Sequence, residues 1–144
     1  DTPVVLVLFG DHKPWMGNGG SAYEEMGIDF DTSTLAGFRN YYATPYLIWA
    51  NRAAKEVLGA DFTGDSGDFS PCFLMTRLFD ACGWAGPGYM QLSRAMRDIS
   101  PLLHTNGLFL HDGVLTSVLS DTDRSFYRSW LAVQYYREHV AAYS

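Results

Sequence analysis

The stretch Val4-Val5-Leu6-Val7-Leu8-Phe9, followed by Gly10-Asp11-His12, decides the fold class predicted for this chain. Its first six residues are all apolar and lack the alternation that marks a strand with one exposed face. Such a run is typical of a strand covered on both faces, as in a parallel sheet between helices. We therefore expect an α/β fold with a central strand at residues 4–9, and a sharp turn at Gly10.

The other expected elements follow from capping and turn residues. Residues 13–43 predict a long loop with one short helix, in which Ser21 and Glu24 have capping-box spacing. Asp112-Gly113 suits a type I′ turn and predicts an antiparallel hairpin. In chain order, we expect a helix near 21–27, a strand at 44–50, helices at 52–58, 71–82 and 89–99, the hairpin at 108–117, and a helix at 123–142.

The composition fits one globular domain over residues 1–144, since the chain is 47% hydrophobic. A formal charge of -6 and the lack of a Lys/Arg cluster argue against nucleic acid as a partner. The longest apolar run is far below the roughly 20 residues that cross a bilayer, so the chain is expected to be soluble. Cys72 and Cys82 flank a predicted helix, whose length, about 15 Å, argues against a disulfide between them.

Asp11 and His12 are the candidate functional residues. In open α/β sheets, ligands bind beyond the carboxyl ends of the strands, where these two residues follow Phe9. A carboxylate oxygen next to an imidazole nitrogen suits Mn²⁺ or Zn²⁺ and is acceptable to Mg²⁺. The alternative is that Asp11 caps the next segment and His12 is ordinary polar surface. Spacing alone leaves both interpretations open.

Three blocks of the sequence resemble a known family in the same order along the chain. They are Val-Leu-Phe-Gly-Asp-His-Lys-Pro-Trp at 7–15, Tyr-Ala-Thr-Pro-Tyr-Leu-Ile-Trp-Ala-Asn at 42–51, and Asp-Phe-Ser-Pro-Cys-Phe-Leu-Met at 68–75. Together they resemble the C-terminal part of the sulfatase-like phosphoglycerol transferases, the lipoteichoic acid synthase family of the alkaline phosphatase superfamily. The resemblance extends over residues 4–84 and is weak after Gly86.

This resemblance implies that Asp11 and His12 ligate one catalytic divalent cation, Mn²⁺ or Mg²⁺. It also implies the C-terminal portion of an alkaline-phosphatase-like sheet flanked by helices. The family's threonine nucleophile, remaining metal ligand and phosphoglycerol-binding residues lie N-terminal to its Gly-Asp-His block. We therefore expect the chain to be about the final third of a larger catalytic domain, inactive alone, and to contain no catalytic nucleophile.

The function implied by the resemblance is transfer of glycerophosphate from phosphatidylglycerol to a hydroxyl acceptor, in lipoteichoic acid or related polymer synthesis. The intact protein would then act at the outer face of a Gram-positive cell membrane. An alternative is a metal-dependent phosphatase, phosphodiesterase or sulfatase of the same superfamily. A second alternative is a non-catalytic binding module in which Asp11 and His12 are structural.

Further candidates have weaker support. Lys13 could place a positive charge beside a substrate phosphate, and Trp15 could wall the glycerol pocket, although solvation and core packing are the commoner roles. His111 could be a downstream metal ligand of the kind found elsewhere in the superfamily. The expected partners are a phosphatidylglycerol head group and the N-terminal part of the same domain. Because unpaired strand edges promote association, we also expect the chain either to self-associate or to repack.

Overall fold

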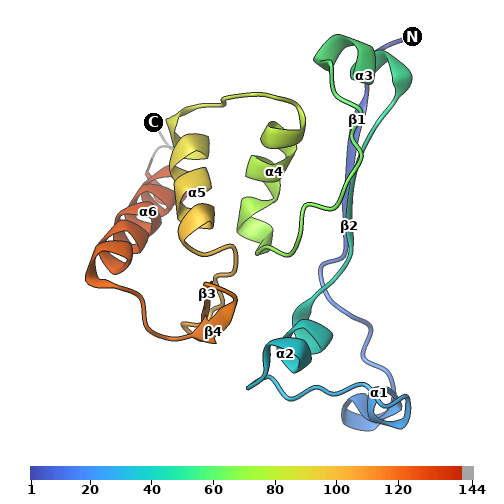
Figure 1. Ribbon diagram of the computed structural model, residues 1–144, viewed down its shortest axis with the longest axis vertical. Coiled ribbons are helices and arrows are strands. Elements are labelled where there is room, and N and C mark those ends of the chain that lie inside the picture. The colour runs from blue at the N-terminus through green and yellow to red at the C-terminus, as the bar shows by residue number, and fades with distance from the viewer. Residues whose placement is uncertain (141–144) are drawn as a thin grey trace. The chain divides into compact units, whose positions relative to one another are not determined.

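A computed structural model describes residues 1–140 and shows a mixed α/β chain. Over that range it contains six α-helices, two short 3-10 helices and two antiparallel two-stranded sheets (Figure 1). The chain divides into two compact units, Asp1–Thr63 and Gly64–Ser144. The mixed α/β class is thus confirmed, whereas no alkaline-phosphatase-like sheet is seen in the described residues. The expectation of a single domain stays a prediction.

The first unit is built on strands β1 (Val5–Phe9) and β2 (Tyr46–Ala50). They pair antiparallel, with Leu6 opposite Trp49 and Leu8 opposite Leu47. The expected parallel pairing of residues 4–9 is therefore wrong for the described part of the chain. In Figure 1, this ribbon has α3 at one end and α1 and α2 at the other.

Burial alternates along β2 and along β1 as far as Leu8, whereas Phe9 at the end of β1 is 59% exposed. Leu6, Leu8, Leu47 and Trp49 share one face and are each 44–53% exposed. On the other face, Ala50 is 2% exposed, because β2 contacts helix α3 there. The apolar run correctly predicted a strand, but the expectation that both of its faces are covered is wrong within residues 1–140. One apolar face of the ribbon remains open to solvent.

Three α-helices complete the first unit: α1 (Ser21–Glu25), α2 (Leu35–Tyr42) and α3 (Arg52–Leu58). The 3-10 helix η1 (Asn18–Gly20) precedes α1. Asn51 caps α3 as expected, because its side chain accepts a hydrogen bond from the Ala54 N–H at 2.9 Å. The expected capping box at Ser21 is wrong, since Gly20 is the N-cap residue and makes no side-chain bond.

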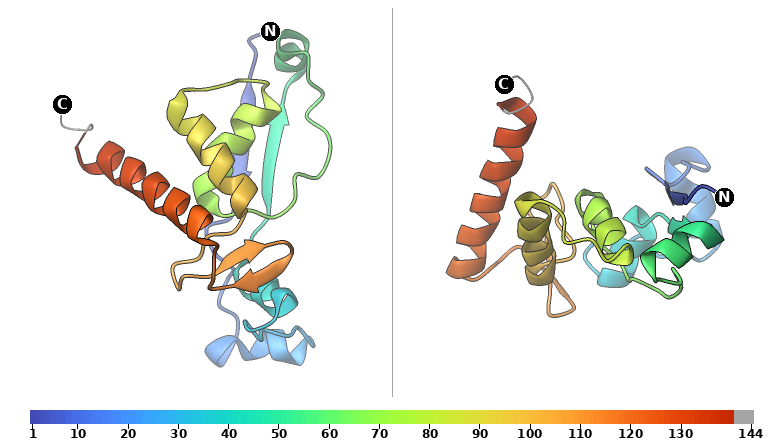
Figure 2. Two further views of the ribbon diagram at one scale, coloured as in Figure 1. Left: turned by 60° about the vertical axis from the view of Figure 1, so that its left-hand side comes forward. Right: turned by 90° about the horizontal axis from the view of Figure 1, so that it is seen from above.

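The second unit contains helices α4 (Leu74–Ala81), α5 (Gly88–Ile99) and α6 (Asp121–His139), with the 3-10 helix η2 (Pro71–Phe73) before α4. Figure 2 shows α5 between α4 and α6, with strands β3 (Phe109–His111) and β4 (Val114–Thr116) at one end of the helices. These strands form the expected antiparallel hairpin.

The turn and the last helix of the second unit follow local capping rules. The φ values of Asp112 and Gly113 are 48° and 78°, as a type I′ turn requires. Helix α6 begins at Asp121, earlier than expected, because the Ser120 hydroxyl accepts a hydrogen bond from the Asp123 N–H at 3.1 Å. The part of this helix expected at 141–142 lies outside the described residues. No helix within residues 1–140 combines the length and apolar character that a membrane span requires.

The core of the second unit centres on Phe73, Met96 and Trp130, which are at most 2% exposed. Trp130 donates its indole N–H to the Ser93 hydroxyl at 3.0 Å, which satisfies the buried donor and fixes α6 to α5. Cys72 and Cys82 are both free, as expected from their predicted separation. The core thus joins α5 and α6 to the 3-10 helix η2, which precedes α4.

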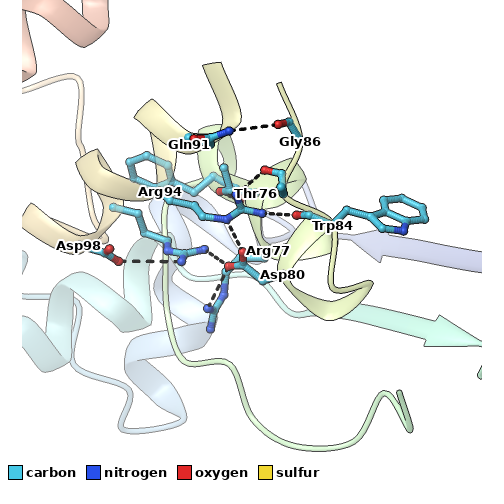
Figure 3. A network of polar contacts seen from close by, with 11 residues as sticks. Thr76, Arg77, Asp80, Trp84, Gly86, Gln91, Arg94 and Asp98 are labelled. Atoms are coloured by element: carbon cyan, nitrogen blue, oxygen red, sulfur yellow. Dashed lines mark hydrogen bonds and ion pairs between the residues drawn. The ribbon is translucent and has the colours of Figure 1, made fainter. Parts of the chain in front are cut away.

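Asp80 links helix α4 to helix α5 through arginine side chains (Figure 3). Its carboxylate oxygens lie 2.5 Å from Arg94 Nε and 2.6 Å from Arg97 Nη1, while Arg77 Nη1 is 3.9 Å away. Arg94 also donates hydrogen bonds to the carbonyl groups of Trp84 and Ala85. Partial burial of Asp80 opposes ionisation, but the hydrogen bonds from Arg94 and Arg97 outweigh it and lower the pKa of the carboxyl group.

Replacing Asp80 with Asn should lower the free energy of unfolding by about 1–3 kcal/mol at pH 7, because the negative charge and one of the two oxygen atoms that accept from Arg94 and Arg97 are lost. A carboxyl group with a lowered pKa stabilises the fold fully above its ordinary pKa, here 3.8, and loses that effect as the pH falls through the lowered value. The parent and Asp80→Asn should therefore become equally stable in strong acid. Urea denaturation followed by circular dichroism measures both effects.

Asp98→Asn is the matched control for this prediction. Asp98 has a side chain that is 74% exposed and lies 3.9 Å from the same Arg97. Exposed pairs of this kind contribute at most about 1 kcal/mol, so the substitution should change stability little. A loss in Asp98→Asn as large as in Asp80→Asn would contradict the special role of Asp80.

Candidate metal-binding loop

The loop after β1 is fixed to the start of β2 at Gly10. The Gly10 N–H donates to the Pro45 carbonyl oxygen at 3.0 Å, and the Thr44 hydroxyl donates to the Gly10 carbonyl oxygen at 2.6 Å. A Cβ atom on Gly10 would lie 3.0 Å from Thr44 Cβ, tighter than nine in ten real contacts of this kind, so Thr44 would have to move slightly to admit it. Glycine therefore suits the close approach of the two chain segments, and the two hydrogen bonds fix the point at which the loop leaves the strand.

Asp11 and His12 follow directly and lie at the surface. Their side chains are 84% and 78% exposed, and His12 Nε2 is 3.7 Å from Asp11 Oδ1. Two metal bonds of about 2.1 Å at a tetrahedral angle would place their donor atoms ~3.4 Å apart. The observed separation is thus close to the distance at which both side chains can hold one cation.

The hydrogen bonds of His12 suit a metal ligand. Its Nδ1 lies 3.0 Å from the Lys13 carbonyl oxygen, which can only accept, so the neutral ring carries its proton on Nδ1. The lone pair is then on Nε2, the atom that faces Asp11. A carbonyl group that holds the other ring nitrogen is the usual support of a ligating histidine. Asp11 Oδ1 also accepts the His12 backbone N–H at 2.8 Å, which fixes the carboxylate beside the ring.

The predicted substrate residues Lys13 and Trp15 lie on the same loop and contact its scaffold. Lys13 donates its ammonium group to the Asn40 carbonyl oxygen of α2. Trp15 is 62% exposed and packs edge-on against Tyr41, with ring centroids 6.3 Å apart. The Tyr23 hydroxyl donates to the Pro14 carbonyl oxygen at 2.6 Å. These contacts hold the loop against α1 and α2, and the substrate roles of Lys13 and Trp15 stay predictions.

Sequence reasoning did not identify Asn40 and Thr44 as positioning residues. Thr44 belongs to the Thr-Pro pair at the start of the second strand, where a hydroxyl before a proline offered a weak signal. Asn40 lies on helix α2, which the sequence analysis assigned to a loop. Both act on the candidate site through its backbone.

The donor chemistry of Asp11 and His12 fits a divalent cation, but it supplies half of a complete ligand set. Zn²⁺ sites generally have four ligands, and Mn²⁺ and Mg²⁺ sites have more. Residues 1–140 contain no group of three or more His, Cys, Asp or Glu side chains placed to hold a metal. A tightly bound cation here would need ligands in addition to this pair.

A second adjacent pair has nearly the same geometry. His111 Nε2 lies 3.7 Å from Asp112 Oδ2, and His111 Nδ1 lies 3.1 Å from the Ile99 carbonyl oxygen. The separation alone therefore does not distinguish Asp11 and His12 from this pair. Both aspartates come after the end of a strand, but Asp112 lies in the short hairpin turn between β3 and β4, whereas Asp11 lies in the longer segment that joins β1 to η1.

The second unit has a cavity of about 320 Å³ that is lined in part by Cys72. The thiol of Cys72 is a poor nucleophile. The residues around the cavity come from η2 and helices α4, α5 and α6, and include Cys72, Met75, Tyr89, Met90 and Arg137. Although Cys72 as a residue is exposed, desolvation of its thiol raises the pKa to about 11. The thiol is therefore protonated at neutral pH, and only the thiolate is strongly nucleophilic.

Comparison of the chain with models of protein families, with curated proteins and with solved structures finds no match. The family resemblance therefore depends on the three sequence blocks themselves. What it implies for metal, substrate and activity stays predicted.

Thr44→Val tests whether the hydroxyl of Thr44 fixes the start of the loop. It leaves the Gly10 carbonyl oxygen without its protein donor and should lower the free energy of unfolding by about 1 kcal/mol. Thr44→Ser retains the hydroxyl and should keep most of that stability. Chemical denaturation of the two variants measures the difference; equal losses would assign the effect to the methyl group instead.

Proposed function

We propose that this chain is the metal-binding C-terminal part of a sulfatase-like phosphoglycerol transferase, in which Asp11 and His12 hold one Mn²⁺ or Mg²⁺ ion. The observation that carries the proposal is the pairing of a free His12 Nε2 with the Asp11 carboxylate, 3.7 Å apart, beyond the end of a strand. The Gly-Asp-His block at this point is also the most specific part of the family resemblance.

The fixed start of the loop supports this assignment. Gly10 and Thr44 set where the chain leaves β1, and the Lys13 contact with Asn40 anchors the residue that follows the pair. Ligands held by a rigid scaffold lose less entropy when they bind a cation. The hydrogen bonds around Asp11 and His12 thus prepare the two donor atoms for one ion.

When bound, a divalent cation activates a nucleophile and neutralises charge on phosphate oxygens. In this proposal, Asp11 and His12 hold that cation, and the nucleophile belongs to the N-terminal part of the same domain. The substrate is then the head group of phosphatidylglycerol, the acceptor is a hydroxyl group of a glycerophosphate polymer or glycolipid, and the intact protein works at the outer face of a Gram-positive membrane. Lys13 and Trp15 lie on the loop where they can contact the phosphoglycerol group.

Mn²⁺ titration followed by nuclear magnetic resonance tests the metal assignment. Paramagnetic broadening should affect the ring signals of His12 at lower Mn²⁺ concentrations than those of His111. Asp11→Ala should weaken the binding of Mn²⁺ at least tenfold, because one of the two protein ligands is lost. Asp112→Ala is the matched control, since it removes the carboxylate of the equivalent pair, and it should leave the His12 response unchanged.

Two results would contradict the metal assignment. One is equal Mn²⁺ affinity in the parent and Asp11→Ala, which would favour a non-catalytic binding module. The other is equal broadening of His12 and His111, which would show that any exposed Asp-His pair responds alike. Both results can be measured without an assay of catalytic activity.

The transferase assignment needs a separate assay with phosphatidylglycerol vesicles. The purified chain should release no diacylglycerol, because the proposed nucleophile lies outside it. In the intact protein, Asp11→Ala should abolish glycerophosphate transfer to a hydroxyl acceptor. Lipid turnover by the chain alone, or a phosphatase, phosphodiesterase or sulfatase activity of the intact protein in place of transfer, would overturn this proposal.

A further inference from the structure

The outer edge of β1 carries backbone groups that have no partner in the described chain. The bonds from Asn51 N–H to the Val4 carbonyl and from Gly10 N–H to the Pro45 carbonyl identify the hydrogen-bonded pairs of the ribbon. These pairs alternate along an antiparallel ladder, so Leu6 and Leu8 direct their backbone groups inward, toward β2. The N–H and C=O groups of Val5, Val7 and Phe9 therefore face away from β2.

No hydrogen bond within residues 1–140 uses these outward groups of Val5, Val7 or Phe9. The edge also lacks the usual protections against strand pairing. Within residues 5–9 there is no charged side chain and no proline, and the register with β2 contains no bulge. Another strand can therefore form backbone hydrogen bonds along this edge.

We propose that the outer edge of β1 binds the same edge of a second copy of this chain, in an antiparallel pair with its two-fold axis at Val7. In this register, Val7 lies opposite Val7 of the second copy, and Val5 lies opposite Phe9. Every outward-facing residue of the strand then pairs with an outward-facing residue, and each such pair exchanges two hydrogen bonds. The interface is isologous, as in most homodimers.

Neighbouring registers pair fewer of the outward backbone groups, so the register centred on Val7 is favoured. A shift of two residues toward the N-terminus places Phe9 opposite Pro3, which has no N–H to donate. A shift in the other direction places Val5 opposite Asp11, beyond the end of the strand. The symmetric register is the one that uses all of the outward groups of β1.

Charge and side-chain chemistry also favour a second copy as the occupant. Both ribbon strands are uncharged, so two copies meet at this edge without local repulsion. Leu6 lies opposite Leu8 of the second copy, which extends the exposed apolar face across a four-stranded sheet. Repulsion between two chains of net charge -6 opposes association, and added salt should therefore strengthen the dimer.

The dimer should be weak, because a pair of five-residue strands buries much less than the roughly 800 Å² per partner of a stable interface. We expect reversible dimerisation in the high micromolar range. Sedimentation velocity from about 5 to 500 µM should show the sedimentation coefficient rise with concentration. A monomer throughout this range at both low and high salt would overturn the proposal.

Hydrogen exchange of the unmodified chain locates the interface. The amide protons of Val5, Val7 and Phe9 should exchange more slowly at 500 µM than at 20 µM. The amides of Ile48 and Ala50, which face outward on the other edge of the ribbon, should be unaffected by concentration. Protection that appears on the β2 edge instead would refute the assignment to β1.

Matched substitutions distinguish dimerisation through the β1 edge from dimerisation through the apolar face. Val7→Pro removes an outward N–H without removing a bond to β2 and should abolish the dimer. Ile48→Pro makes the same change on the other edge and should leave the dimer intact, with circular dichroism confirming that both variants fold. Leu47→Lys places a charge on the open face, and loss of the dimer in this variant would show face-to-face packing and overturn the edge assignment.

Discussion

The antiparallel register of β1 and β2 is the constraint on which the first unit depends. It places Gly10 beside Thr44 and Pro45, so the loop with Asp11 and His12 begins at a point set by ladder geometry. The same register directs one set of backbone groups to β2 and the other set to solvent. It also gathers four apolar side chains, of which Leu8 is the most exposed, on one face. A single pairing thus determines the candidate site, the free edge and the open face.

Local signals in the sequence predicted most elements, because short-range hydrogen bonds form them. The Asn51 cap and the Asp112-Gly113 turn are examples, and the structure confirms both. Helix α2 was missed because Gly37 lowers its helix propensity. A Cβ there would lie 2.1 Å from the Asp31 carbonyl oxygen, so glycine is required by a contact that the sequence pattern does not reveal. The predicted parallel pairing of β1 was wrong for a similar reason, since an apolar run specifies a strand but not the neighbouring strands or their direction.

The sequence identified Asp and His as the residue types of the candidate site, but it did not show which Asp-His pair is the better candidate. Sequence position placed Asp11 and His12 after a strand, and the structure adds the orientation of the ring through the Lys13 carbonyl group. It also shows that His111 and Asp112 reach the same separation by a different route. Adjacent Asp and His side chains approach each other wherever the backbone turns, so proximity is a weak criterion. The proposal for the first pair therefore rests on the Gly-Asp-His block and on the hydrogen bonds that hold Gly10 to Thr44 and Pro45.

Each unit consists of one continuous stretch of chain, and this bears on synthesis as well as on the folded state. Strand β1 leaves the ribosome before its partner β2, which follows after about 36 residues. At roughly 5–20 residues per second, the uncharged strand waits about two to seven seconds for its only ladder partner in the described chain. During that interval neither edge of β1 has a ladder partner within the described chain. Within the first unit, β1 is therefore exposed to mispairing until β2 has been synthesised.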